Sequence, residues 1–158
     1  MCANRRDSLR NIYSLARNVY AASGTIVAVI PETHLDILEK RSFAHVATLM
    51  PDGSPHVTPV WVDHVDGEYV RFNTARGRRK ERNIANDPRV GVSVIDPEDP
   101  YRFVSVRGEA TMTEEGAVDH INELAAAYMG VDEYPHHGEE DGERVLVRIS
   151  PDSVTHTG

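Results

Sequence analysis

The sequence predicts a mainly β domain of the α+β class, in which six short antiparallel strands form a small Greek-key barrel with two or three flanking helices. Three observations support this prediction. Apolar and polar residues alternate in several short segments separated by turn residues, most clearly in residues 56–64. Residues 117–128 instead have the helical spacing of apolar residues. The chain of 158 residues has the length of one domain and can bury a core without disulfide bonds.

The predicted strands are joined by residues that favour tight turns. Pro51–Gly53 and Asp66–Gly67 connect the first three strands, which we expect to form an antiparallel meander. Gly108 lies inside the fifth strand and is expected to mark a bulge. The six expected strands are Ala44–Leu49, His56–His64, Glu68–Asn73, Val90–Val94, Arg102–Met112 and Val145–Ile149.

Three segments of the sequence predict helices. Pro31 suits the first turn of a helix that continues to Arg41. A short helix that carries Ile84 should follow the basic loop and end before Pro88. The third helix covers residues 117–128 and ends at Gly130, while residues 131–143 are acidic and predict an exposed loop.

Residues 1–30 differ from the rest of the chain because they are rich in arginine and contain one acid, Asp7. Three interpretations remain open for this segment: a short amphipathic helix, an arginine-rich targeting segment, or a start upstream of the folded domain. The apolar residues at helical spacing are Leu9, Ile12, Tyr13, Ala16, Val19 and Tyr20. We expect an N-terminal extension over residues 1–30 and a single domain over residues 31–158.

Composition narrows the classes of function. Lys and Arg total 17 and Asp and Glu total 25, so a net charge of −8 argues against a nucleic-acid-binding protein. No apolar run approaches the ~18–20 residues that a membrane-spanning helix requires. Cys2 is the single cysteine, which excludes a disulfide within the chain and argues against a cysteine-rich zinc site. We therefore expect a cytoplasmic protein with no metal centre and with neither nucleic acid nor membrane as partner.

The segment Arg76–Arg82 has the highest density of positive charge in the sequence. It holds five of the 17 cations and one acid, which gives a local charge of +4 at the junction of a strand and a helix. Free backbone N–H groups and basic side chains favour an anion there, so one interpretation is a phosphate site. A solvent-exposed charged surface is the alternative, and a nucleic-acid patch is disfavoured by the lack of interleaved aromatic residues.

Few residues suit acid–base or nucleophilic catalysis. His136 and His137 are adjacent in a loop, so their side chains cannot easily converge on one metal ion. Tyr101 and His56 are the two proton donors that we nominate as catalytic candidates.

Several segments together resemble a known family. Phe72–Lys80 resembles the strand-to-helix segment by which split-barrel proteins of the pyridoxamine 5′-phosphate oxidase type hold a flavin phosphate. FAHVATLMPDGSPHVTPVWVD, FNTARGRRKERNIANDPRV and YRFVSVRGEATM resemble the branch of that superfamily that uses the deazaflavin coenzyme F420, as do YMGVDEYP and RVLVRISPDSV. The resemblance covers residues 31–155 and implies a six-stranded split β-barrel of the FMN-binding type.

The sequence departs from true pyridoxamine 5′-phosphate oxidases at positions that matter for their substrate. Thr58 and Asp63 replace an Arg and a Lys of the second strand, Arg78 replaces a phosphate-binding Ser, and the C-terminal Arg-x-His signature is absent. These differences argue against oxidation of vitamin B6.

The resemblance implies a homodimeric, F420-dependent reductase that passes hydride to a small organic substrate, with its cofactor site at the subunit interface. FMN is the alternative cofactor, and a non-catalytic cofactor carrier is the alternative function. Residues of the second strand would flank the ring system, residues of the third would line its rim, and residues of the basic loop would bind the phosphate. The implied cofactor-binding residues are, in that order, Thr58, Pro59, Val60 and Trp61; Phe72, Asn73 and Thr74; and Arg78, Arg79 and Lys80. Trp61 and Phe72 could instead belong to the barrel core.

Overall fold

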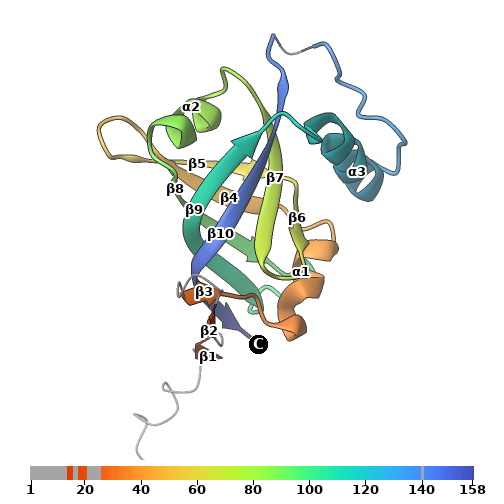
Figure 1. Cartoon of the computed structure of the whole chain (residues 1–158). Coiled ribbons are helices and arrows are strands. Elements are labelled where there is room, and N and C mark those ends of the chain that lie inside the picture. Colours follow the sequence, from red (N-terminus) through yellow and green to blue (C-terminus); the bar gives the residue numbers. More distant parts are fainter. Residues whose placement is uncertain (1–13, 16–17, 21–25, 140) are drawn as a thin grey trace, which may run out of the picture.

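The computed structural model describes residues 14–15, 18–20, 26–139 and 141–158, and a curved antiparallel sheet dominates it (Figure 1). The strands are β1 (Ser14–Leu15), β2 (Asn18–Tyr20), β3 (Ile26–Ala28), β4 (Ala44–Leu49), β5 (Pro55–Val60), β6 (Val62–Val65), β7 (Tyr69–Ala75), β8 (Arg89–Ile95), β9 (Phe103–Thr113) and β10 (Arg144–Thr157). The helices are α1 (Leu35–Glu39), α2 (Arg79–Asn86) and α3 (Ala117–Met129), and a 3₁₀ turn, Glu32–His34, precedes α1. The mainly β prediction and the three predicted helices are confirmed.

The main sheet runs in the order β5-β4-β8-β9-β10-β7-β6, with β1 paired to β10 beside this path. Every pairing in it is antiparallel. β5 and β6 are neighbours in the chain but lie at opposite ends of this order. The short link between them therefore joins the two edges of the sheet, which curves it into a split barrel.

This path has seven strands, so the expectation of six is wrong. The predicted strand 56–64 is two strands, because its hydrogen-bonding partner changes at Trp61: Val60 pairs with Ala44 of β4, whereas Val62 pairs with Phe72 of β7. The expected three-stranded meander is accordingly two hairpins at opposite edges. Its second turn, Asp66–Gly67, has positive φ angles of 50° and 71°, as a tight hairpin requires.

The last strand is much longer than the predicted Val145–Ile149. β10 has 14 residues and continues through Pro151, where its register to β9 shifts before Ser153. The irregularity expected at Gly108 thus lies in the opposite strand. Gly108 itself is required for close approach, because a Cβ there would lie 1.9 Å from the Ser150 carbonyl oxygen.

The described part of the N-terminal segment contains strands where one interpretation expected a helix. Ser14 pairs with His156 of β10, and β2 pairs with β3, so the helical interpretation is wrong for residues 14–15 and 18–20. The pairing with β10 satisfies the backbone N–H and C=O groups of β1. The periodicity of residues 9–20 could not predict it, because the partner strand is far away in the chain. Leu9, Ile12, Tyr13 and Ala16 of that predicted helix lie outside the described residues, as does Cys2.

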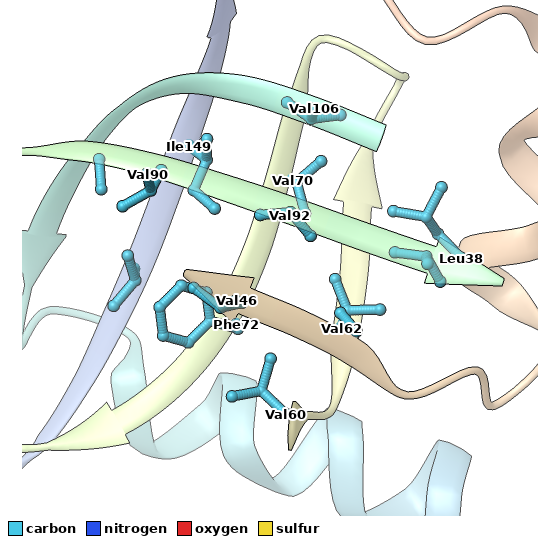
Figure 2. Packing of buried hydrophobic residues seen from close by; sticks show 14 of the residues in the cluster. Leu38, Val46, Val60, Val62, Val70, Phe72, Val90, Val92, Val106 and Ile149 are labelled. Atoms are coloured by element: carbon cyan, nitrogen blue, oxygen red, sulfur yellow. The ribbon is translucent and has the colours of Figure 1, made fainter. Parts of the chain in front are cut away.

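The core lies inside the curved sheet and contains buried valines from all seven strands of this path. Figure 2 shows several of them with Phe72 and Ile149. The alternation predicted for β8 is confirmed, since Val90, Val92 and Val94 are buried and their neighbours are not. α2 packs on β4 and β7, and α3 packs on β7 and β10. Within the described residues, no helix is both long and apolar enough to cross a membrane.

Candidate functional site

A cavity of about 180 Å³ has lining residues from α2, α3, β7 and β10. Figure 1 shows α2 and α3 on either side of the neighbouring ends of β7 and β10. The lining residues of the cavity come from β5 and the link to β6, from β7, from both helices, from the start of β10 and from two connecting segments. They are Phe43, Pro59, Val60, Trp61, Asn73, Arg78, Lys80, Ile121, Leu124, Tyr134 and Arg144. Six of the ten predicted cofactor-binding residues are therefore brought together, although they span two strands and a helix.

Aromatic rings form part of the cavity wall and its support. Trp61 stacks on Tyr128 with ring centroids 5.2 Å apart and an interplanar angle of 19°. The ring of Tyr134 meets Trp61 edge-on at 6.1 Å. Trp61 is partly exposed in the cavity wall, whereas Phe72 lies wholly in the barrel core. Of the two residues for which both interpretations were open, Trp61 therefore lines the cavity and Phe72 belongs to the core.

Thr58 and Thr74 lie in the strands that carry lining residues, but their own side chains are directed into the interior. Both hydroxyl oxygens are buried, and neither has a hydrogen-bond partner among the described residues. A buried hydroxyl without a partner costs free energy, so such groups are often satisfied by a ligand or a water molecule. Because neither side chain lines the cavity, these two hydroxyl groups are not available to a ligand bound there.

The cations of the basic loop have two different surroundings: some line the cavity, and one forms ion pairs with acidic residues. Arg78, at the N-cap of α2, and Lys80, in its first turn, line the cavity. Arg76 instead forms ion pairs with Glu114 (2.7 Å) and Glu81 (2.9 Å), and these two carboxylates raise its pKa.

Glu81 holds the basic loop in its conformation. Its other carboxylate oxygen accepts a hydrogen bond of 3.0 Å from the backbone N–H of Gly77, which has a φ of 83°. This contact satisfies one N–H group ahead of the helix, as an acid in the first turn commonly does. Arg79 and Arg82 are exposed and are not among the lining residues. The positive charge on the cavity wall therefore comes from Arg78, Lys80 and Arg144.

A buried polar network lies behind the cavity wall. Asp63 accepts two hydrogen bonds from Arg71, at 2.8 and 2.6 Å, and lies 3.3 Å from Nε2 of His120. Burial alone would raise the pKa of Asp63, but the hydrogen bonds from His120 and Arg71 outweigh it, so this pKa is lowered. Asp63 is thus an ionised residue held by structural partners.

The family of the chain follows from its sequence match. The model of the pyridoxamine 5′-phosphate oxidase family matches residues 30–158. The chain belongs to this family. The predicted membership is therefore confirmed, and the curved sheet described above is the split barrel of the family.

Solved structures of similar fold include other pyridoxamine 5′-phosphate oxidase-like proteins. An F420 reductase is 34% identical, with a TM-score of 0.69, over 79% of this chain and 98% of its own. A conserved hypothetical protein from Mycobacterium tuberculosis is 26% identical, with a TM-score of 0.63, over 82% of this chain and 86% of its own. General stress protein 26 from Bacillus anthracis is 22% identical, with a TM-score of 0.60, over 80% and 92% respectively, and shows the fold alone. Comparison with curated proteins gave no match.

The catalytic candidates lie away from the cavity of this pyridoxamine 5′-phosphate oxidase family member. Tyr101 is 86% exposed in the turn between β8 and β9, and His56 is half-buried in β5; neither lines the cavity. His136 and His137 contact Glu139 (2.7 Å) and Asn122 (2.9 Å). The described residues contain no group of three potential metal ligands.

Several site residues of this family member were missed by sequence reasoning. His120 had a detectable signal, because it is a polar residue on the apolar face of the predicted helix 117–128. Tyr134 and Arg144 lie in YMGVDEYP and RVLVRISPDSV, two segments that carry the family resemblance, but nothing local marks them as cavity residues. Phe43, Ile121 and Leu124 could be predicted as apolar residues but not as cavity lining.

Proposed function

We propose that this protein is an oxidoreductase that binds the deazaflavin coenzyme F420 in the cavity beside Trp61 and passes hydride between the coenzyme and a small organic acceptor. The observation that carries the proposal is the composition of the cavity, whose lining combines the aromatic side chains of Trp61 and Tyr134 with the cations Arg78 and Lys80. A planar ring with a phosphorylated tail has the matching distribution of apolar surface and charge. The 34% identity to an F420 reductase supports this choice of cofactor.

The roles of the chain's own residues follow from their positions. Arg78 and Lys80 bind the phosphate, with the N-terminal N–H groups of α2 nearby. Pro59, Val60 and Trp61 exclude water from the ring, and Asn73 contributes a polar group to its rim. Arg79 is exposed and adds positive charge at longer range. When bound, the coenzyme supplies the hydride chemistry, while the protein supplies orientation and electrostatics.

A homodimer completes the site in this proposal. The cavity of about 180 Å³ is smaller than the ~300–1,000 Å³ that drug-sized ligands occupy, so one protomer encloses only part of the coenzyme. On the outer sheet face, formed by outward-pointing residues of β4, β5 and β8, five residues have small or apolar side chains that a second protomer could cover, beside the polar His45 and Arg89. The five are Ala47, Val57, Gly91, Ser93 and Ile95.

Two alternatives are each favoured by a specific observation. FMN suits the same cavity, because flavin and deazaflavin share their ring shape and the position of the phosphate. A cofactor carrier is favoured by the position of Tyr101 and His56, which leaves the cavity without an assigned proton donor among the described residues of one protomer. Oxidation of the reduced coenzyme by candidate acceptors in a single turnover separates an enzyme from a carrier.

The proposal is tested by titrating the purified protein with F420 and with FMN, followed by fluorescence. The double variant Arg78→Ala/Lys80→Ala removes charge-assisted contacts, each worth about 1.5–3 kcal/mol. We expect at least tenfold weaker coenzyme binding with little change in the melting temperature. Arg82→Ala, an exposed cation of the same helix, is the control and should bind as the wild type does. Unchanged affinity in the double variant would show that these cations are not the phosphate site.

A further inference from the structure

Arg144 is a cation of the cavity wall to which the proposed function assigns no role. It begins β10, and its Nε donates a hydrogen bond of 2.8 Å to Oδ1 of Asn73. Its guanidinium carbon lies 5.3 Å from the ring centroid of Tyr134, whose edge meets Trp61. Both contacts hold the guanidinium beside the ring of Tyr134 in the cavity wall.

Asn73 is itself fixed in orientation. Its amide nitrogen donates to the carbonyl oxygen of Ala117 at 2.7 Å and lies 3.3 Å from Nδ1 of His120. These contacts require the amide nitrogen on the α3 side, so the amide oxygen must face Arg144. Asn73 is 8% exposed, and little space is left for it to turn.

His120 connects Asn73 to a further pair of charged residues. Because Nδ1 faces the amide N–H of Asn73, it must act as the acceptor, and the ring proton is then on Nε2, which faces the Asp63 carboxylate. Asp63 is held in turn by two hydrogen bonds from Arg71. A chain of polar contacts therefore runs from Arg71 and Asp63 through His120 and Asn73 to Arg144, and it helps to orient the guanidinium.

We propose that Arg144 is a specificity-determining residue that recognises the ring system of the bound coenzyme, by donating hydrogen bonds to carbonyl oxygen atoms at the ring edge. The proposal rests on the proposed function. A guanidinium presents its N–H donors in a fixed plane, which suits the edge of a flat heterocycle better than the rotating ammonium group of a lysine. Arg78 immediately precedes α2 and Lys80 lies in its first turn, whereas Arg144 begins β10. In this proposal the phosphate and the ring are thus recognised by cations from different elements.

Binding measurements with phosphorylated and unphosphorylated ligands test this assignment. Arg144→Gln should bind F420 at least tenfold more weakly than the wild type, and it should lose the same factor with the deazaflavin riboside that lacks the phosphate. Arg144→Lys should recover only part of the loss, because it keeps the charge without the planar donors. In contrast, Arg78→Ala/Lys80→Ala should lose affinity for F420 but not for the riboside.

Arg148→Gln is the matched control. Arg148 lies in the same strand, and its guanidinium carbon lies 5.1 Å from the ring centroid of Tyr69, but it is exposed and does not line the cavity. Its substitution should leave both affinities unchanged. Thermal unfolding of each variant verifies folding, and if Arg144→Gln does not fold, the Lys variant decides the question.

The possible results separate this inference from the proposed function. If the wild type binds neither F420 nor FMN, the proposed function is wrong and the assignment of Arg144 falls with it. If the wild type binds F420 and the Arg144 variants bind equally well, only the role of Arg144 is refuted. A loss that appears with F420 and disappears with the riboside would place Arg144 in the phosphate site and would also overturn the assignment.

Discussion

Asp96 shows how a single buried carboxylate can tie distant elements together. Its side chain follows β8 and is 3% exposed, yet it accepts hydrogen bonds from the backbone N–H of Glu98 (2.9 Å) and from Arg102 (2.6 Å) and Lys40 (3.1 Å). The N–H of Glu98, followed by Arg102 and Lys40, lowers its pKa from 3.8 to about 2. The end of α1 is thereby fixed to the turn between β8 and β9.

The lowered pKa of Asp96 predicts a pH-dependent contribution to stability. Because the folded-state value lies below the unfolded one, the contribution is fully present above about pH 4 and is lost as the pH falls towards about 2. We therefore expect Asp96→Asn to lower the urea midpoint clearly at pH 7 and much less at pH 2. Asp132→Asn, at an exposed position, should have little effect at either pH. A deficit of equal size at both pH values would contradict this interpretation of Asp96.

At the scale of elements, the break between β5 and β6 depends on a side chain from α3. The backbone N–H of Val62 donates to Oη of Tyr128 at 3.1 Å, and the same hydroxyl donates to the carbonyl oxygen of Ser42 at 2.6 Å. Burial raises the pKa of Tyr128, so the hydroxyl stays protonated and able to donate. Tyr128 thus connects the start of β6 and the segment before β4 to α3.

Tyr128→Phe tests this role without removing the ring that stacks on Trp61. Loss of the hydroxyl leaves the buried N–H of Val62 without this partner, and we expect a decrease of about 1–3 kcal/mol in the free energy of unfolding. Chemical denaturation monitored by tryptophan fluorescence measures it. Tyr101→Phe provides the comparison, because that hydroxyl is exposed and its loss should change stability by less than about 0.5 kcal/mol. Equal effects of the two substitutions would argue against a special role for Tyr128.

At the scale of the whole molecule, the outer sheet face decides whether the proposed homodimer can form. Val57 and Ile95 are 57% and 48% exposed on this face, and Ala47, Gly91 and Ser93 lie between them together with His45 and Pro59. A face with exposed apolar residues and few charges can be covered by a second copy through a two-fold axis. The small volume of the cavity also leads us to expect a dimer, because one protomer encloses only part of the coenzyme.

The double variant Val57→Glu/Ile95→Glu should disrupt this assembly, because it places four charges in the interface of a symmetric dimer. We expect sedimentation to show a dimer for the wild type and a monomer for the variant at micromolar concentration, with at least tenfold weaker coenzyme binding. Val118→Glu is the control, since Val118 is 51% exposed on α3, outside this face. A wild-type monomer that binds the coenzyme tightly would exclude the proposed shared site.

The sequence alone determined those features that depend on residues close together in the chain. Strand β8 follows from the alternation of Val90, Val92 and Val94, and the end of α3 follows from Gly130, whose φ is 71°. The basic loop and the first turn of α2 are also local features of the sequence. Because the family resemblance rests on such local segments, it could predict six residues of the cavity lining. The division at residue 30 and the binding roles of all ten residues stay predictions.

Only the tertiary structure decided which segments pair and which side chains meet. Residues 56–64 alternate continuously, so nothing local shows that the strand leaves β4 and joins β7 at Trp61. Arg144 and Asn73 are 71 positions apart, and their contact requires β10 to lie beside β7. The physical reason is the same in both cases: periodicity records which face of a strand is buried, whereas the identity of its neighbour depends on residues far away in the chain.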